Sequence, residues 1–510
     1  MALSGITFVR GTGGLGRPLP GVDHISGQVH YIANADLPSG FETTDREVKV
    51  FSLEEAEALG ITDLNTLEVK ATGTVTVTGV GSNGDTFEVV VAEYGSDVSL
   101  GTYTKLSGDT TVTLVAVAIT ALINSGTLTH GYTATSAIGV VTVISRAGLG
   151  VFLNTGTPLS TTIVGTMTAT VAQFGAGALI DGLASTIDPI HYHVSEYFRL
   201  QPQGVLYIGL YAIPATYDFA EVATLLDFAG GEIKQLGVRV SSTTLTAAMV
   251  TALDAKLMTY AGVGYDKPAS AVLTADFNGT ALSALPTLAS NSDYRVSVDI
   301  AQDGAAKGYE LYKANGKTIG CMGAKLGIIS LASVNSCIGD VGQFDMSNGI
   351  ELEVIAFGNG VTYKTQALSL LTTLDTYKYN FLRKRAVAGS YWEDSNTSIA
   401  DTSDFAFIEN VRTVDKAIRL TKINSEIKIN STLTLNSDGT LSEDTIADFL
   451  RLANIGLDDM LRNGEISAYV TTMSPTQNVL ATSKVVINIA IVPTGVARQI
   501  QFNVGLTSSI

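Results

Sequence analysis

Residues 484–507 alternate between apolar and polar side chains, with a turn in the middle. The apolar positions of the two runs are Val485, Ile487, Ile489 and Ile491, then Ile500, Phe502, Val504 and Leu506. A period of two places such residues on one face of a β-strand. Residues 493–495, Pro-Thr-Gly, separate the runs and favour a turn. The pattern therefore predicts two one-sided strands.

The middle of the chain alternates between short apolar runs and longer amphipathic segments. Strands are predicted at 204–213, 233–241, 267–276 and 294–303, and helices at 218–231 and 244–262. This alternation is typical of a mostly parallel sheet covered by helices. Residues 321–339 form a predicted small-residue helix that is apolar on most faces. Such a helix is expected to pack closely against another element.

Two further amphipathic helices are predicted at 404–423 and 442–464, followed by a strand at 466–473. Ser442 begins the second helix as its N-cap, with acidic residues directly after it.

Residues 71–175 follow a different pattern from the rest of the chain. They alternate Thr and Val with glycine-rich turns, which predicts hairpins around a helix at 108–126. We interpret this segment as an inserted β-rich module.

The helix predicted in the insert has a cap and a stop signal of its own. Asp109 or Thr110 is the candidate N-cap, and Gly126 is the candidate end. Lys105 and Arg146 are the insert's two basic residues.

Residues 6–10, Ile-Thr-Phe-Val-Arg, form a short apolar run before a glycine cluster at Gly11, Gly13, Gly14 and Gly16. The spacing G-x-G-x-x-G matches a dinucleotide-binding turn, but the Arg-Pro-Leu-Pro-Gly that follows cannot open the required helix. An extended arm with a flexible joint is therefore predicted. A strand at either end of the chain needs a partner for its backbone. It can pair within its own chain or complete the sheet of a neighbouring copy.

The low fraction of charged residues and the negative net charge limit the classes of protein and of partner to be expected. Charged residues make up 15% of the 510 residues, and the net charge is −17. Because about 25% is usual in soluble proteins, the apolar surface is expected to be covered in a large oligomer. The negative charge argues against a nucleic-acid partner. No apolar run approaches the roughly 18 residues that cross a bilayer, so no direct membrane insertion is expected. Arg10 and the glycines leave no apolar core for a signal peptide.

Candidate catalytic and metal-binding residues are few. His191 and His193 are predicted on one side of a strand, but Glu196 falls on the other side and no third metal ligand is evident. Cys321 and Cys337 are the two cysteines and are interpreted as small buried residues. P-loop, HExxH and GxSxG motifs are absent from the sequence. No catalytic residue, metal or cofactor is therefore expected.

Five segments resemble the sheath protein of contractile phage tails and related contractile injection systems. They are 13–17, 322–344, 405–419 and the strand-forming 485–506, together with the insert at 71–175, which resembles the Thr/Val/Gly modules spliced into many phage structural proteins. The resemblance implies a non-enzymatic structural subunit that forms hexameric rings stacked helically around an inner tube protein. Baseplate and tail-terminator or cap proteins are the other implied partners. It further implies a place in a virion tail or injection particle that is assembled in the bacterial cytoplasm.

The resemblance also implies a mechanism. Terminal strands of each subunit insert into the sheets of its neighbours, and subunits rotate to a lower-energy packing that drives the tube through an envelope. The exchanged residues would be Ile6, Thr7, Phe8 and Val9 with Ile500, Phe502, Val504 and Leu506. The glycine cluster Gly11, Gly13, Gly14 and Gly16 would then be the hinge.

A contact with the tube is predicted on the 404–423 helix. Arg412, Lys416 and Arg419 are spaced i, i+4 and i+7 on one face. The alternative is a solvated face paired locally, Glu409 with Arg412 and Asp415 with Arg419.

The expected fold class is a multidomain α/β or α+β protein with a mixed sheet core, an inserted β-rich domain and terminal strand arms. The expected domains are an arm at 1–22, a core at 23–70 and 176–400, the insert at 71–175 on the outside, an inner tube-facing domain at 401–480, and strands with an arm at 481–510. A carbohydrate- or receptor-binding tail or baseplate component is the runner-up, with its ligand on the insert. An NAD-dependent enzyme ranks last.

Overall fold

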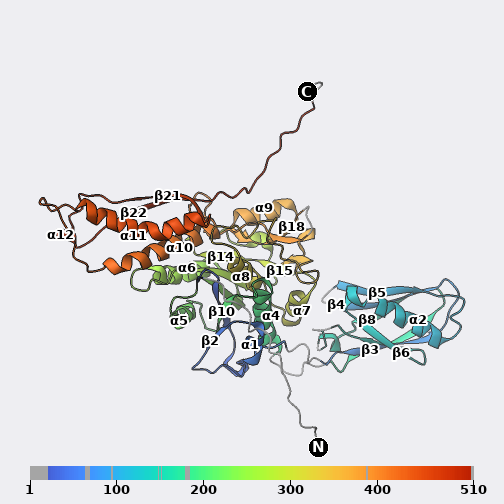
Figure 1. Cartoon of the computed structure of the whole chain (residues 1–510). Coiled ribbons are helices and arrows are strands. Elements are labelled where there is room, and N and C mark those ends of the chain that lie inside the picture. Colours follow the sequence, from blue (N-terminus) through green and yellow to red (C-terminus); the bar gives the residue numbers. More distant parts are fainter. Residues whose placement is uncertain are drawn as a thin grey trace, which may run out of the picture.

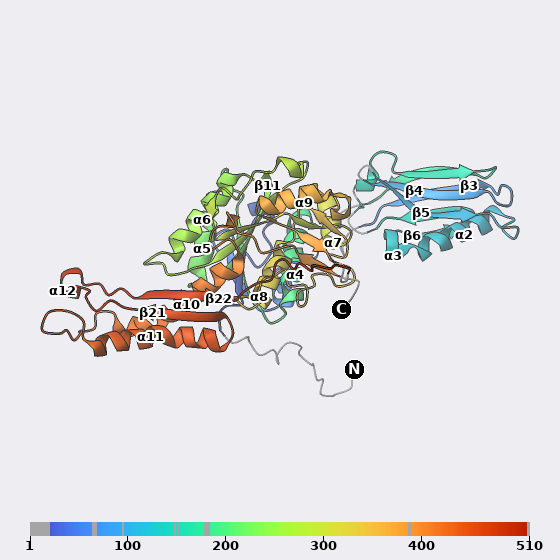
Figure 2. The same cartoon turned by 90° about the horizontal axis from the view of Figure 1, so that it is seen from above.

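The structure is a computed structural model that describes residues 21–63, 69–93, 96–146, 149–150, 152–177, 184–385 and 389–506. A central α/β body carries a β-rich unit on one side and an elongated C-terminal unit on the other (Figures 1 and 2). The predicted fold class, a multidomain mixed α/β protein with an inserted β-rich unit, is confirmed.

A seven-stranded sheet forms the centre of the body, in the order β17-β14-β12-β11-β1-β10-β2. The strands are β1 (Ile25–Tyr31), β2 (Glu47–Val50), β10 (Val205–Tyr211), β11 (Gln235–Thr244), β12 (Ser270–Asp276), β14 (Val296–Asp299) and β17 (Tyr379–Asn380). Neighbouring strands run parallel except β2, which is antiparallel to β10. The prediction of a mostly parallel sheet is confirmed. Strand β1 was not predicted from the sequence.

Helices cover both faces of this sheet. On one face α5 (Ala220–Phe228), α6 (Ala247–Ala261) and α9 (Leu368–Thr376) pack against apolar residues such as Val29 and Val238. On the other face α4 (Ala184–Leu200) and α1 (Leu53–Ala58) pack against Leu206, Ile208 and Leu210. Next to α4 lie α7 (Lys307–Asn315) and α8 (Met322–Leu331).

The remaining strands of the body form short pairs. They are β13 (Ser292–Asp293) with β20 (Ser398–Ile399), β15 (Ala301–Asp303) with β16 (Ile355–Phe357), and β18 (Leu382–Lys384) with β19 (Ser390–Trp392). The segment predicted as one strand at 294–303 is therefore divided between β14 and β15. The small-residue helix predicted at 321–339 is shorter, because α8 ends at Leu331 and Ala332 is extended.

The interpretation of residues 191–193 as part of a strand is wrong, because they lie in helix α4. Two residues are separated by about 200° on a helix, so His191 and His193 do not share a face. His191 Nε2 lies 2.9 Å from a Glu57 carboxylate oxygen. His193 is buried, where its Nδ1 accepts from the Gly323 N–H (3.2 Å) and its Nε2 donates to the Ile319 carbonyl (3.1 Å).

The inserted unit consists of two sheets with a common core. One is β6-β7-β3-β9 and the other is β5-β4-β8. Their strands are β3 (Thr72–Gly79), β4 (Thr86–Glu93), β5 (Ser96–Thr104), β6 (Thr133–Ala137), β7 (Val140–Ile144), β8 (Leu159–Val164) and β9 (Thr168–Gly175). Helix α2 (Val112–Ser125) and the short α3 (Thr127–His130) complete the unit, and α2 packs its buried residues into the core. Thr111 is the N-cap of α2, one residue beyond the predicted candidates, and Gly126 ends it as predicted.

The C-terminal unit consists of α10 (Ile408–Ser425), α11 (Glu443–Arg462), β21 (Ile466–Thr472), α12 (Val479–Thr482) and β22 (Asn488–Pro493). Ser442 caps α11 as predicted, accepting a hydrogen bond from the Thr445 N–H. The two strands pair antiparallel with each other. The strand predicted at 499–507 is not formed, since residues 494–506 run along and away from the body without regular structure (Figure 1).

Candidate assembly site

The C-terminal arm, residues 494–506, exposes its apolar residues to solvent. Ile500, Phe502, Val504 and Leu506 have 72%, 83%, 92% and 107% of their surface accessible. No described strand pairs with residues 499–506. The four side chains still follow the period of two that lets a strand bury one face. The predicted N-terminal counterparts Ile6, Thr7, Phe8 and Val9, and the glycines Gly11, Gly13, Gly14 and Gly16, lie outside the described residues.

The same chain contains a sheet that is incomplete. β21 and β22 form a two-stranded sheet, so each strand has an outer edge that pairs with no described strand. Ile491 and Tyr469 of this sheet pack toward the helices, near Ala417 and Leu457. A two-stranded sheet is marginal by itself and is stabilised by additional strands or by helices that it covers.

An apolar groove runs between β22 and α10. Its volume is about 350 Å³, and it is lined by Val414, Ala417, Ile418, Thr421, Lys422, Ile489 and Ile491. Ile418 is more than half exposed there. A strand added at the outer edge of β22 would lie over this part of α10. The groove can therefore accept the apolar face of one extended segment.

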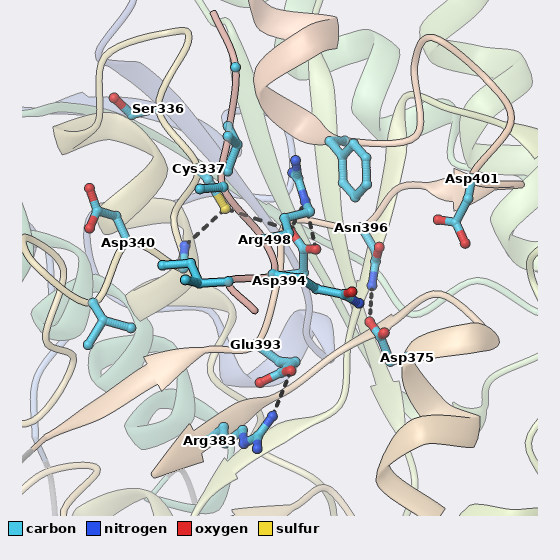
Figure 3. A pocket seen from close by; sticks show the side chains of 18 of the residues that line it. Ser336, Cys337, Asp340, Asp375, Arg383, Glu393, Asp394, Asn396, Asp401 and Arg498 are labelled. Carbon is cyan, nitrogen blue, oxygen red and sulfur yellow. Dashed lines mark hydrogen bonds and ion pairs between the residues drawn. The ribbon is translucent and has the colours of Figure 1, made fainter. Parts of the chain in front are cut away.

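The base of the C-terminal arm is fixed to the body by the Arg498 cluster, which consists of Arg498, Asp394, Glu409 and Phe407. Arg498 Nε lies 2.8 Å from Asp394 Oδ2, and its Nη2 lies 2.5 Å from Glu409 Oε1. The guanidinium carbon lies 3.4 Å from the centre of the Phe407 ring. Glu409 is buried, so Arg498 neutralises a carboxylate that has little access to water. Three groups thus hold one side chain, and Figure 3 shows Arg498 beside one of them, Asp394.

A large open groove surrounds this cluster, with a volume of about 1220 Å³. Several of its charged side chains pair with one another: Arg383 and Arg385 both pair with Glu393, and Lys378 pairs with Asp401. Burial, with the nearby Glu409 and Asp394, raises the pKa of the Cys337 thiol to about 12. A thiol with this pKa is protonated at neutral pH and is a poor nucleophile.

No group of three His, Cys, Asp or Glu side chains within the described ranges could hold a metal ion. Across these ranges no helix has the length and apolar character needed to cross a bilayer.

The basic stripe predicted on α10 as a tube contact is covered by other parts of this chain. Arg412 is buried and donates to the carbonyls of Ala332 and Ser333 (3.1 and 3.2 Å), and burial lowers its pKa to about 10. Lys416 and Arg419 are mostly covered and pair with Asp23. The physical reason is that this face of α10 lies on the body.

The local pairs suggested as the alternative do not form either. Glu409 pairs with Arg498, Asp415 with Arg295 at 2.8 Å, and Arg419 with Asp23. Lys416 also pairs with Glu465 (2.5 Å), so replacing the three cations by glutamate would place like charges beside Asp23 and Glu465. Such a reversal would disturb folding and would not test tube contact.

The aromatic residues that the structure describes in the insert do not form a stacking surface for sugars. Phe87, Tyr103, Tyr132 and Phe174 belong to the buried core of the insert. Phe152 is more exposed than these four, with 37% of its surface accessible. Tyr94 lies outside the described residues. Sugar recognition commonly needs exposed aromatic faces, so the runner-up function receives no support from these side chains.

Comparison with known proteins gives one partial family match and several structural ones. Residues 404–510 match the family model described as DUF2586, C-terminal domain. No curated protein shows significant similarity to the chain. The solved structures that it resembles include sheath and baseplate structures of contractile particles.

The contracted helical sheath of the anti-feeding prophage is 16% identical, with 62% of this chain and 81% of that chain covered and a TM-score of 0.43. The contracted PVC sheath complex of an extracellular contractile injection system is 14% identical, with 63% of this chain and 81% of that chain covered and a TM-score of 0.40. A sheath tail protein from Desulfitobacterium hafniense is 11% identical, with 96% of this chain and 100% of that chain covered and a TM-score of 0.35. The function proposed below rests instead on the arm, the open edges and the contacts of this chain.

Sequence reasoning found the exposed arm residues through their period of two, but it missed the groups that fix the arm. Arg498, Phe407 and Asp23 are isolated residues in the sequence, and their partners are distant in it. No local pattern marks such residues, because a contact between segments about 90 to 400 positions apart leaves no periodic signal.

Proposed function

We propose that this chain is the structural subunit of a contractile tail sheath. Copies polymerise around an inner tube and stay linked through exchanged strands while the sheath contracts. No catalytic step is needed, because the work is stored in the packing of the assembled subunits. The observation that carries the proposal is the exposed, alternating arm at 499–506 in a chain that also has an open sheet edge beside an apolar groove.

The arm fits the groove in length and in chemistry. Eight residues in a strand span about 26 Å, which is enough to pair with all of β22. The apolar face of Ile500, Phe502, Val504 and Leu506 would then cover α10 around Ile418. Burying each such side chain stabilises by up to about 1.5–3 kcal/mol. The backbone groups of both strands would also gain hydrogen-bond partners.

Exchange between copies is favoured over closure within one chain. The arm follows β22 directly, so closure would require residues 494–498 to reverse the chain beside their own strand. Thr494 instead accepts a hydrogen bond from Asn335 (3.1 Å), and Arg498 is fixed by its cluster on the body. Both contacts direct residues 499–506 away from the sheet that they follow.

The N-terminal strand Ile6–Val9 and the hinge at Gly11, Gly13, Gly14 and Gly16 would supply the second link of each subunit. With two links per copy, the subunits form a connected mesh. The mesh stays intact when the subunits move as near-rigid bodies during contraction. The tube-facing surface is not assigned to Arg412, Lys416 and Arg419, because these side chains already bind within the subunit. Baseplate and terminator proteins would meet the two ends of the polymer.

A matched pair of arm variants tests the proposal. Phe502→Asp places a charge on the apolar face of the arm, whereas Asn503→Asp places the same charge on its polar face. Electron microscopy of the purified chain is expected to show long tubes for the wild type and for Asn503→Asp. For Phe502→Asp it is expected to show no tubes, with monomers in sedimentation velocity. Tubes of normal length from Phe502→Asp would contradict the proposal.

A further inference from the structure

Both arms of the subunit begin at ion-pair clusters on the same helix, α10. The C-terminal arm is fixed where Arg498 binds Glu409, in the first turn of α10. On the N-terminal side, Asp23 lies two residues before β1, in the short segment that connects residues 1–20 to the central sheet. It binds Lys416 (2.8 Å) and Arg419 of α10. We call Asp23, Lys416 and Arg419 the Asp23 cluster.

The two clusters are close together along a stiff element. Glu409 and Arg419 are separated by ten residues, which is about 15 Å along an α-helix. Helix α10 is itself bound to the body, since Asp415 forms a bidentate ion pair with Arg295 (2.8 and 3.0 Å) and Arg412 donates to two carbonyls. The helix therefore lies between the bases of both arms, and its contacts with the body fix its position.

The partners in both clusters are partly or fully withdrawn from water. Lys416 and Arg419 expose 13% and 16% of their side chains, and Glu409 exposes 4%. Burial alone would raise the pKa of Asp23, but the charges of Arg419 and Lys416 hold it below its ordinary value. Pairs of this kind resist separation more than exposed pairs do, because breaking one leaves a charge in a poorly solvated place.

We propose that α10 is the element that transmits tension from one arm to the other within each subunit, and that Asp23 and Arg498 are the positioning residues that connect the arms to it. This inference rests on the proposed function, since the arms carry load only if they bind other copies. A pull on the C-terminal arm then passes through Arg498 and Glu409 into α10. It leaves through Lys416, Arg419 and Asp23 toward the N-terminal arm.

The test measures the mechanical strength of assembled tubes. Asp23→Asn and Arg498→Gln each remove one connection and keep both arm sequences. Lys49→Gln is the matched control, because it breaks the Lys49–Glu232 pair (2.6 Å), which lies at neither arm. Each variant is assembled, its monomer melting temperature is recorded, and the tubes are passed through a narrow capillary before electron microscopy.

Asp23→Asn and Arg498→Gln tubes are expected to form but to break several-fold shorter than wild-type and Lys49→Gln tubes. The double variant is expected to match the shorter single variant, since links in series fail at the weaker one. Sheared lengths equal to the wild type, or a double variant whose shortening is the product of the two, would overturn the inference. Normal tubes from Phe502→Asp would instead overturn the strand exchange itself, and the tension path with it.

Discussion

Glu351 is a carboxylic acid that the folded chain keeps in its neutral form. Burial, together with the nearby Asp303 and Glu196 carboxylates, raises its pKa from 4.5 to about 8. Its Oε1 accepts from the Lys307 N–H (3.3 Å), while Oε2 accepts no hydrogen bond from any described residue. Asp303 beside it caps the start of α7 through the N–H groups of Ala306 and Tyr309.

This shift predicts how stability depends on pH. Because the folded pKa is above the unfolded one, the unfolded chain releases this proton first as the pH rises. The free energy of unfolding therefore falls between about pH 4.5 and pH 8 and is constant above that range. One pKa unit corresponds to about 1.4 kcal/mol, so Glu351→Gln is expected to stabilise the chain by up to a few kcal/mol at pH 8 and hardly at pH 4.5.

Urea unfolding of wild type and variant at both pH values measures the effect. Glu353→Gln is the control, because its side chain is 42% exposed and pairs with Lys384 at the surface. Equal stabilisation of Glu351→Gln at both pH values would contradict the assigned cause.

At the residue scale, positions governed by local chemistry were predictable and positions governed by distant partners were not. Ser442 and Gly126 act as the caps that their sequence context predicts. Arg412 was expected at the surface, yet it is buried because two carbonyls from the loop after α8 accept from it. A helical spacing identifies a face but does not say whether that face meets solvent or another part of the chain.

At the scale of elements, α8 lies against α4 at a distance that only glycine permits. A Cβ added at Gly323 would lie 2.1 Å from the His193 carbonyl oxygen, and one at Gly327 would lie 2.9 Å from the Tyr197 carbonyl oxygen. The small-residue pattern of this helix predicted close packing, and this prediction is confirmed.

Gly323→Ala is therefore expected to destabilise the body by about 1–3 kcal/mol or more, since the backbone of α4 or α8 must move. Gly108→Ala serves as the control, because a Cβ there meets no atom within 4 Å. Thermal unfolding followed by circular dichroism compares the two. A Gly323→Ala melting temperature equal to that of the control would show that the crossing is looser than described.

The elements that were misread share a physical cause. Helix α4 is buried on nearly all sides between Ile187 and Phe198, and its short His-Tyr-His-Val segment alternates like a strand when it is considered by itself. Strand β1 was missed because Ser26, Gln28 and His30 are polar although all of β1 is buried. Burial lowers the pKa of His30 to about 3, with Arg239 contributing, so it stays neutral in the core.

At the scale of the whole molecule, the insert is attached at two neighbouring points. Thr72 of β3 and Gly175 of β9 are paired residues, so the two ends of the insert lie side by side. An ion pair between Arg146 of the insert and Glu310 of α7 (3.0 Å) connects the insert to the body. Its core residues otherwise cluster among themselves.

Deleting residues 72–175 and joining the ends with a short Gly-Ser linker is expected to leave the body folded and able to form tubes. The measurements are the melting temperature of the body and electron microscopy of the polymer. Full-length Glu310→Gln is the control for loss of the Arg146 contact alone. A deletion variant that folds but forms no tubes would contradict the outer placement of the insert.

The sequence analysis predicted the arm residues 499–506 as a strand, and within one chain they are not one. A strand at the end of a chain takes its structure from a backbone partner, and under the proposed function that partner belongs to another copy. Local sequence thus identifies which side chains can share a face. It does not identify the molecule that supplies the second strand.

The most direct measurement is a cryo-electron microscopy structure of tubes assembled from the full chain. The account predicts continuous density for residues 499–506 of one copy along the outer edge of β22 in another, with Phe502 over the groove lined by Val414 and Ile418. Density in which the arm folds back on the β21–β22 sheet of its own copy, or in which neighbouring copies share no backbone pairing, would contradict it.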